Sequence, residues 1–378
     1  MCNWFGQNKD FLSGAASFFT VIGTIGALML RPIFAAPALA LLMVAGLAGQ
    51  ADAKKYTCKS DRGKSPYPVV ATPDHDNDRY TPNQKEIVKR FGAYVSSFDG
   101  NDDDDGDGKS DLLAVPQWVS YELKGLQPNA AGEFKEPDIS INRPNDWYKA
   151  PGLSFLWTNR AGVTKKRIDN SYDSIGCIWN RGHLAMADHT QRISWQASCN
   201  TYFFWNAVPQ AADMNQGPWR HLEDYTAAAA NKLKRLWIMA GPVFEQGKPV
   251  GFIGEKAKGE IPVAVPHALF KVIVRDIGGG KVDALAFLFP QPYVEGADGQ
   301  PRPTATWVNC NKAKSQNHTY DHKPRLVTVA KVEALTGLTF FPGAVNREEA
   351  RSRQPAKLWT VEKKYWDPRG CGGQRFVP

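Results

Sequence analysis

The sequence lacks the motifs that are typical of a zinc or other transition-metal hydrolase. None of its seven histidines stands in an H-E-x-x-H pattern, and its six cysteines include no C-x-x-C pair. Those spacings bring metal ligands close together, so their absence disfavours a hydrolase built on such a site. The chain also has no internal repeats, which excludes a repeat array.

The composition is that of a globular protein with a sizeable core. The chain has 378 residues, of which 43% are hydrophobic and 22% charged, so it is neither wholly disordered nor a coiled coil. Its length suits one large domain or two ordinary ones. Lys and Arg number 46 against 38 Asp and Glu, a formal net charge of +8. This surplus favours a polyanionic partner, which is nucleic acid, an acidic polysaccharide or an anionic membrane face.

Residues 1–53 have the pattern of a secretory signal peptide. Arg31 precedes an almost wholly apolar run over residues 32–48, and Ala51-Asp52-Ala53 follows it. This order predicts cleavage after Ala53, and an ordinary signal length points to Met29 as the true start. The alternative, one or two membrane spans, is disfavoured because the apolar run upstream of Arg31 is short for a span. We therefore expect a secreted or periplasmic protein without stable membrane association after cleavage.

Five cysteines remain after that cleavage, and in an oxidising compartment most of them should form disulfides. The sequence alone leaves their connectivity open. We expect Cys310–Cys371, which would close the C-terminal region, and Cys177–Cys199, which would bracket the motif described below. Cys58 would then remain unpaired.

Helices and strands are expected to mix without regular βαβ units. Apolar spacing predicts helices over residues 83–98, 218–236 and 328–335. Alternating or short apolar runs predict strands over residues 118–123, 236–240, 269–275 and 283–289. The last two strands are joined across three consecutive glycines at 278–280, which is a hairpin signal. This mixture favours an α+β fold with an antiparallel sheet.

A dense acidic run over residues 99–111 has half of a calcium-loop pattern. Gly108 permits the tight turn, and the candidate oxygen ligands are Asp103, Asp105, Asp107 and Asp111. The usual Glu at the twelfth position is replaced by Ala114, so an EF-hand is not expected. Two interpretations stay open: a shorter Ca²⁺-binding loop, or a solvated acidic loop that binds nothing.

One stretch holds the residue types that phosphodiester hydrolysis requires. It contains Arg181-Gly182-His183, Asn206 followed by Pro209-Gln210, Asn215-Gln216-Gly217 followed by Trp219, and Leu222-Glu223. Histidine accepts a proton from water near neutral pH, arginine grips phosphate, and carboxamide and carboxylate oxygens suit a hard cation such as Mg²⁺. Together they would supply an activated water, a cation for developing negative charge, and a phosphate clamp. Taken singly, each residue has an ordinary structural role, so the interpretation rests on their order and spacing.

The same stretch resembles a known family. The patterns Arg-Gly-His, Asn-x-x-Pro-Gln and Asn-Gln-Gly-x-Trp-x-x-Leu-Glu are similar to those of the sugar-nonspecific ββα-metal nucleases, the DNA/RNA non-specific endonucleases. The likeness extends over about residues 112–371. It implies an α+β fold over residues 112–378, with a central antiparallel sheet flanked by helices. Residues 54–111 would then form an N-terminal extension that contains the acidic run.

The resemblance implies a role for each residue of the motif. His183 matches the general base that activates water, and Asn215 matches the direct ligand of a single Mg²⁺ ion. Glu223 matches the acidic residue that holds water on the metal. Arg181 matches a phosphate-contacting arginine, and Asn206 matches an asparagine near the scissile phosphate.

The resemblance also implies partners and a cofactor. Arg143, upstream of the motif, matches a further arginine that stabilises the transition state. Mg²⁺ is the implied cofactor, with Mn²⁺ as a substitute, and DNA and RNA are the implied substrates. A homodimer is compatible with this resemblance.

Two positions depart from the family pattern. Asn180 stands where the family usually has Asp, and Ala227 stands where it usually has Arg. The lost carboxylate would weaken the orientation or the affinity of the metal site. We expect a secreted Mg²⁺-dependent endonuclease that cleaves DNA and RNA without strong sequence preference and leaves 5′-phosphate ends. The alternative is a catalytically weak nucleic-acid-binding protein of the same fold.

Overall fold

The structure is a computed structural model, and it describes residues 56–58, 74–75, 86–99, 113–137, 141–142, 147, 171–173, 178–254 and 260–371. The expected signal peptide, the part of the acidic run after Asp99 with all the candidate calcium ligands, Arg143 and Cys177 lie outside these residues. Within the described ranges, none of the helices combines the length and the apolar character that a membrane span requires.

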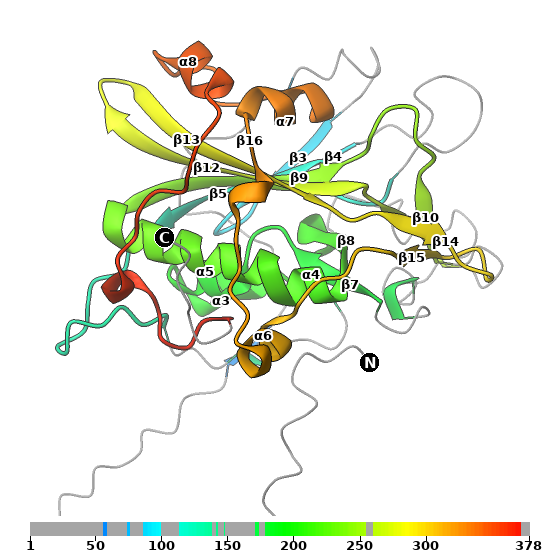
Figure 1. Ribbon diagram of the computed structural model, residues 1–378, viewed down its shortest axis with the longest axis horizontal. Helices are drawn as coiled ribbons and strands as arrows, with labels where there is room; N and C mark the ends of the chain where they lie inside the picture. The colour runs from blue at the N-terminus through cyan, green and yellow to red at the C-terminus, as the bar shows by residue number, and fades with distance from the viewer. Residues whose placement is uncertain are drawn as a thin grey trace, which may run out of the picture. The chain divides into compact units, whose positions relative to one another are not determined.

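A seven-stranded antiparallel sheet is the largest element of the described chain (Figure 1). Its strands follow the spatial order β16, β13, β12, β9, β5, β4, β3. Their bounds are Leu326–Val327 for β16, Lys281–Pro290 for β13, Ala268–Gly278 for β12, Arg235–Val243 for β9, Trp118–Lys124 for β5, Val95–Asp99 for β4 and Glu86–Arg90 for β3. Every neighbouring pair is antiparallel, which confirms the expected α+β fold.

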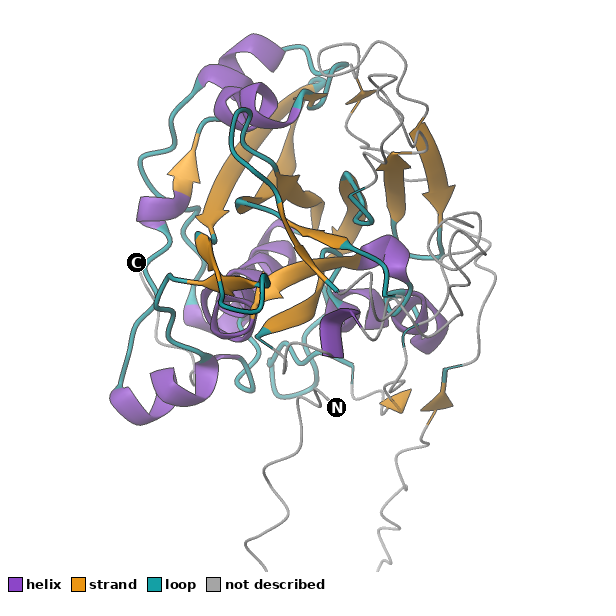
Figure 2. Cartoon of the chain, turned by 90° about the vertical axis from the view of Figure 1, so that its right-hand side faces the viewer, coloured by secondary structure: helices purple, strands orange, loops and turns teal. Residues whose placement is uncertain are grey.

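Helices lie on both sides of this sheet, as two perpendicular views show (Figure 1, Figure 2). The long helix α5 (Arg220–Leu233) lies on one side. The shorter helices α7 (Val329–Thr336) and α8 (Arg347–Ser352) lie on the other. The candidate site belongs to the side that carries α5.

Each face of the sheet has its own apolar core, because side chains alternate along a strand. In β12, Leu269 and Ile273 join the cluster that contains residues of α5. Phe270 and Val272, at the intervening positions, join the cluster that contains residues of α7. A charged side chain on the first face of β12 would therefore lie beneath α5.

The sequence of α5 explains its position and its length. Four consecutive alanines, the best helix formers, are all buried in its second half. Gly217, with φ −131° and ψ −107°, bends the chain just before the helix, and Pro218 follows it. Lys234 ends the helix with φ 76°. The expected helix over residues 218–236 is thus confirmed with shorter bounds.

The expected helix over residues 83–98 is wrong, because this segment forms β3 and β4. The two strands pair antiparallel, and the N–H of Phe91 donates to the carbonyl of Tyr94 (2.7 Å) in the turn between them. Gly92 in this turn would disfavour a helix. Pairing of β4 with β5 decides the outcome, and local apolar spacing cannot reveal such a contact. The sheet therefore includes strands from the expected N-terminal extension.

Two expectations that rest on local signals are confirmed. β12 and β13 form a hairpin through the glycines at 278–280, all of which have positive φ. The helix α7 begins after Thr328, whose hydroxyl accepts a hydrogen bond from the N–H of Lys331. It ends at Gly337, with φ 73°, a conformation that favours glycine.

The disulfides agree only in part with expectation. Cys310–Cys371 is confirmed, with the two Cα atoms 5.0 Å apart. Cys199 pairs with Cys58 (Cα–Cα 5.3 Å), so the expected Cys177–Cys199 bond and the unpaired Cys58 are both wrong. The partners of this bond are 141 residues apart in the chain, and only tertiary packing brings them together.

Candidate active site

A two-stranded antiparallel sheet leads into the helix α5 (Figure 1). β7 (Trp179–His183) pairs antiparallel with β8 (Ala207–Ala211). The chain then continues through α4 (Ala212–Met214) and the short π-helix η4 (Asn215–Trp219) into α5. This order of strand, strand and helix is the one implied for a ββα-metal site.

Close packing at Gly182 holds β7 and β8 together. A Cβ atom added at Gly182 would lie 2.2 Å from the side chain of Gln210, so a larger residue there would force Gln210 or the strands to shift. Gln210 is fully buried, and neither polar atom of its carboxamide has a hydrogen-bond partner among the described residues. The spacing of the strands is thus set one residue before His183.

His183 is half-buried at the end of β7 and is held by aromatic rings. Its ring centroid lies 4.6 Å from that of Trp147 and 5.0 Å from that of Tyr202, whose plane is perpendicular to it. Arg181 is also half-buried and shares one face of the strand with His183, because side chains alternate along β7. A guanidinium nitrogen of Arg181 lies 3.6 Å from a carboxylate oxygen of Asp173.

Asn206 is fully buried and bonded to the backbone next to His183. Its Nδ2 donates to the carbonyls of Ala185 (2.9 Å) and Thr201 (3.0 Å), and its Oδ1 accepts from the N–H of Ala185 (2.7 Å). These bonds fix the chain where it leaves β7. The expected position of Asn206 near a scissile phosphate stays a prediction.

A hydrogen bond joins Asn215 to the strand that carries His183. The Nδ2 of Asn215 donates to the Oδ1 of Asn180 (3.0 Å), and the Nε2 of Gln216 donates to the same oxygen (2.9 Å). With its nitrogen engaged, Asn215 has its side-chain oxygen left as the group that could meet a cation. Asn180, Asn215 and Gln216 are all half-buried, so solvent reaches this corner.

Glu223 lies in the first turn of α5 and forms a buried ion pair that the sequence analysis did not anticipate. Its Oε1 is 3.3 Å from the Nζ of Lys271 on β12, and the two side chains are 6% and 0% exposed. The Nζ also lies 4.1 Å from the ring centroid of Trp219. The available signal was a lysine in the middle of an otherwise apolar strand.

Burial governs the protonation of this cluster. It raises the pKa of the Glu223 carboxyl above its ordinary value, and the positive charges of Lys271 and Arg220 oppose that shift. Burial also lowers the pKa of His189 well below its usual range, so this imidazole is neutral near pH 7. His189 faces Tyr121 Oη at 3.0 Å and the carbonyl oxygen of Glu223 at 3.1 Å, which ties it to the backbone of α5.

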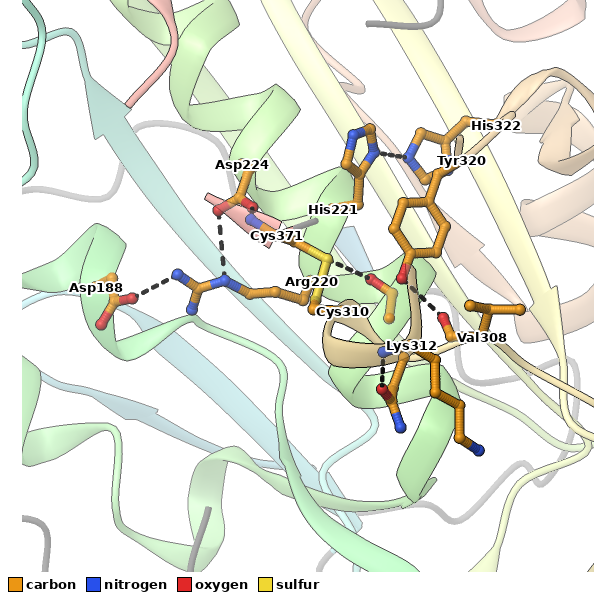
Figure 3. Close-up of a disulfide and its surroundings, with 12 residues drawn as sticks. Asp188, Arg220, His221, Asp224, Val308, Cys310, Lys312, Tyr320, His322 and Cys371 are labelled. Carbon is orange, nitrogen blue, oxygen red and sulfur yellow. Dashed lines mark hydrogen bonds and ion pairs between the residues drawn. A yellow bond between two sulfur atoms is a disulfide. The ribbon is translucent and has the colours of Figure 1, made fainter. Parts of the chain in front are cut away.

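Salt bridges and a disulfide anchor the start of α5 (Figure 3). The guanidinium of Arg220 lies 2.9 Å from Asp188 and 3.3 Å from Asp224. The N–H of Cys371 donates to the other carboxylate oxygen of Asp224 (2.6 Å), beside the Cys310–Cys371 bond. The C-terminal segment therefore helps to fix the turn that carries Glu223.

The donor set suits a hydrated hard cation. The described residues contain no group of three or more His, Cys, Asp or Glu side chains that could hold a metal ion. Mg²⁺ does not need such a group, because it keeps several waters and takes one or two protein oxygens. The carboxamide oxygen of Asn215 and the carboxylate of Glu223 fit that requirement.

Several known proteins are similar to this chain over part of its length. "Endonuclease G, mitochondrial" from Homo sapiens is 26% identical over 178 residues, which cover 46% of this chain and 52% of that protein. "Nuclease EXOG, mitochondrial" from Homo sapiens is 29% identical over 176 residues, 45% of this chain and 42% of that protein. The chain spans about half the length of these relatives. A solved structure of an EndoG/EndoGI complex matches with a TM-score of 0.46 and 20% identity, over 70% of this chain and 89% of that chain.

These names contradict the expected secreted or periplasmic location. Both relatives are named as mitochondrial proteins. The apolar run before Ala53 did not decide the compartment. Hydropathy shows that the segment is apolar, but it does not show which targeting receptor recognises the segment.

The family description "DNA/RNA non-specific endonuclease" matches residues 85–347. The match begins just before β3, contains the whole ββα unit and extends to the start of α8. It includes His183, Arg181, Asn206, Asn215 and Glu223. The chain therefore belongs to the DNA/RNA non-specific endonuclease family.

Proposed function

We propose that this protein is a Mg²⁺-dependent endonuclease that hydrolyses phosphodiester bonds of DNA and RNA. Cleavage would show no strong sequence preference and would leave 5′-phosphate ends. Family membership supports the reaction class. The observation that carries the proposal is the hydrogen bond between Asn215 and Asn180, because it joins the candidate cation ligand to the strand that ends at His183.

His183 would act as the general base. The imidazole of a histidine can accept a proton from water near neutral pH. Water attacks phosphorus and its proton passes to the His183 ring. The bond from phosphorus to the 3′ oxygen breaks, and that oxygen keeps the electron pair and takes up a proton from solvent. The phosphate then stays on the 5′ end of the downstream fragment. The rings of Trp147 and Tyr202 hold the base in place.

Mg²⁺ and Arg181 would stabilise the negative charge on the scissile phosphate. Asn215 would hold Mg²⁺ through its side-chain oxygen, and Glu223 would accept hydrogen bonds from the water shell of the ion. When bound, Mg²⁺ neutralises the charge that develops on the phosphate and on the leaving oxygen. Arg181 would grip a phosphate oxygen from the same face of β7 as His183.

Weak sequence preference would follow from contacts to the backbone of the nucleic acid. Phosphate contacts position a protein on the substrate but carry no sequence information. The net charge of +8 favours such contacts. We therefore expect binding to weaken steeply as salt rises.

A nuclease assay on the full chain tests the proposal. Plasmid DNA and RNA should be cut with Mg²⁺ or Mn²⁺ and left intact with a chelator, and the products should accept a 5′ label only after phosphatase treatment. His183→Ala should lower turnover by roughly 10²–10⁴-fold, the usual share of a general base, and leave DNA binding largely intact. Near-normal turnover of that variant would contradict the assignment of His183.

A second function is a catalytically weak nucleic-acid-binding protein, which Asn180 favours because a carboxamide replaces the usual carboxylate. Binding without cleavage at any concentration of Mg²⁺ or Mn²⁺ would support it.

Ca²⁺ binding by the acidic run, with ligands from Asp103 to Asp111, is tested separately by calorimetry with Ca²⁺. If neither the wild type nor Asp105→Ala releases heat on addition of Ca²⁺, the acidic run is a solvated loop that binds no calcium.

A further inference from the structure

Lys271 is a fully buried charge in the middle of a core strand. Leu269 and Ile273, two positions before and after it, share its face of β12 and pack in the core beneath α5. An aliphatic side chain would fit the same pattern. Burying an ammonium group opposes folding strongly unless a partner compensates for the lost water.

Two groups compensate the ammonium of Lys271, one from the last residue of η4 and one from the first turn of α5. The Nζ lies 3.3 Å from Glu223 Oε1 and 4.1 Å from the ring centroid of Trp219. Trp219 and Glu223 are four residues apart, so they lie one above the other on the same helical face. The amine sits between a carboxylate and the face of an indole, both of which attract a cation.

Stability alone does not account for this pair. Replacing a buried ion pair by apolar residues of similar volume is often neutral or stabilising. The surrounding residues of β12 are already apolar, so such a replacement is sterically simple. Packing does not require the desolvation cost of a buried Lys271 ammonium. This cost indicates that the positive charge of Lys271 has a role of its own.

Lys271 donates a hydrogen bond directly to the Glu223 carboxylate. Arg220, three residues before Glu223, also attracts this carboxylate electrostatically, and it forms ion pairs with Asp188 and Asp224. Ala227, one turn further along α5, carries no charge.

We propose that Lys271 is a positioning residue of the metal site, and this inference rests on the proposed function. The charge-assisted hydrogen bond from Nζ holds Oε1 of Glu223 against the sheet and thereby fixes the direction of the carboxylate. Glu223 has three side-chain torsions, and without this bond its carboxylate samples several rotamers. A fixed carboxylate receives the water shell of Mg²⁺ without a further loss of side-chain freedom.

The test is a double-mutant cycle on Mg²⁺ binding to the substrate-free full chain. Calorimetric titration with Mg²⁺ compares the wild type, Lys271→Met, Glu223→Gln and the double variant. We expect Lys271→Met to raise the Mg²⁺ dissociation constant about 10- to 100-fold, as loss of an outer-shell partner commonly does. The double variant should bind no more weakly than Glu223→Gln, because Lys271 acts through Glu223.

Lys281→Met is the matched control, because it makes the same chemical change at an exposed position of β13. It should leave the Mg²⁺ dissociation constant unchanged. An unchanged or lower dissociation constant in Lys271→Met would overturn the inference and leave the proposed function standing. The inference would also be overturned if the double variant bound Mg²⁺ more weakly than Glu223→Gln does. This comparison can be made even if Lys271→Met alone does not fold. Absence of Mg²⁺ binding by the wild type would instead overturn the proposed metal site, and the inference with it.

Discussion

Asn180, next to the candidate cation ligand Asn215, differs from the usual aspartate of the family pattern in charge rather than in shape. Asn180 accepts two hydrogen bonds through one oxygen, from Asn215 and Gln216. It therefore orients Asn215 as an aspartate would. As a neutral group, however, it adds no negative charge for a divalent ion.

Asn180→Asp should strengthen metal binding. The carboxylate has nearly the same size, accepts the same two hydrogen bonds and adds a negative charge. We expect the Mg²⁺ concentration for half-maximal cleavage to fall roughly tenfold, which corresponds to about 1.4 kcal/mol of added attraction. Asn180→Ala, which removes the acceptor, should shift the same titration in the opposite direction. Equal titration curves for the wild type and Asn180→Asp would show that this position does not influence the cation.

Secondary-structure elements in this protein divide by how local their determinants are. The helix α7 carries its own capping residues, so the sequence sufficed to place it. The strands β3 and β4 have apolar spacing that also fits a helix, and their pairing with β5 decided between the two. The motif that β7 and β8 carry was recognised in the sequence, but the pairing of the two strands and their close packing were visible only in three dimensions.

Gly182→Ala tests that packing. The added Cβ would meet Gln210 at 2.2 Å, so the strands must separate or the side chain must move. Overpacking of this kind costs about 1–3 kcal/mol, and His183 would be displaced with the strand. Chemical denaturation should show the loss, and nuclease turnover should fall as well. Gly343→Ala, which has open space and no positive φ, should change neither property. Wild-type stability of Gly182→Ala would mean that β7 and β8 pack more loosely than these distances imply.

For the molecule as a whole, the C-terminal segment contributes to the site from a distance in sequence. The Cys310–Cys371 disulfide joins residues 61 apart, and Cys371 also bonds Asp224 next to Glu223. The bond therefore combines global stabilisation with a local constraint on α5.

The double variant Cys310→Ser/Cys371→Ser should lower the free energy of unfolding by about 2–4 kcal/mol, because the unfolded chain regains the freedom that the cross-link removes. Urea denaturation measures this effect. The double variant has no disulfide at this position for dithiothreitol to reduce. The wild type, by contrast, should lose the stability that this disulfide provides when it is reduced. Equal midpoints for the oxidised wild type and the variant would refute a stabilising role for this bond.

The sequence by itself determined the family, the order of the site residues and the elements whose signals lie within a few residues. A motif records chemistry at fixed spacing, and caps or glycine turns act over one helical turn or one hairpin. Only the tertiary structure decided the strands over 86–99, the Cys58–Cys199 bond and the Lys271–Glu223 pair. Each of these joins segments that are distant or ambiguous in sequence. Their free energy comes from packing and pairing in three dimensions, which local sequence does not encode.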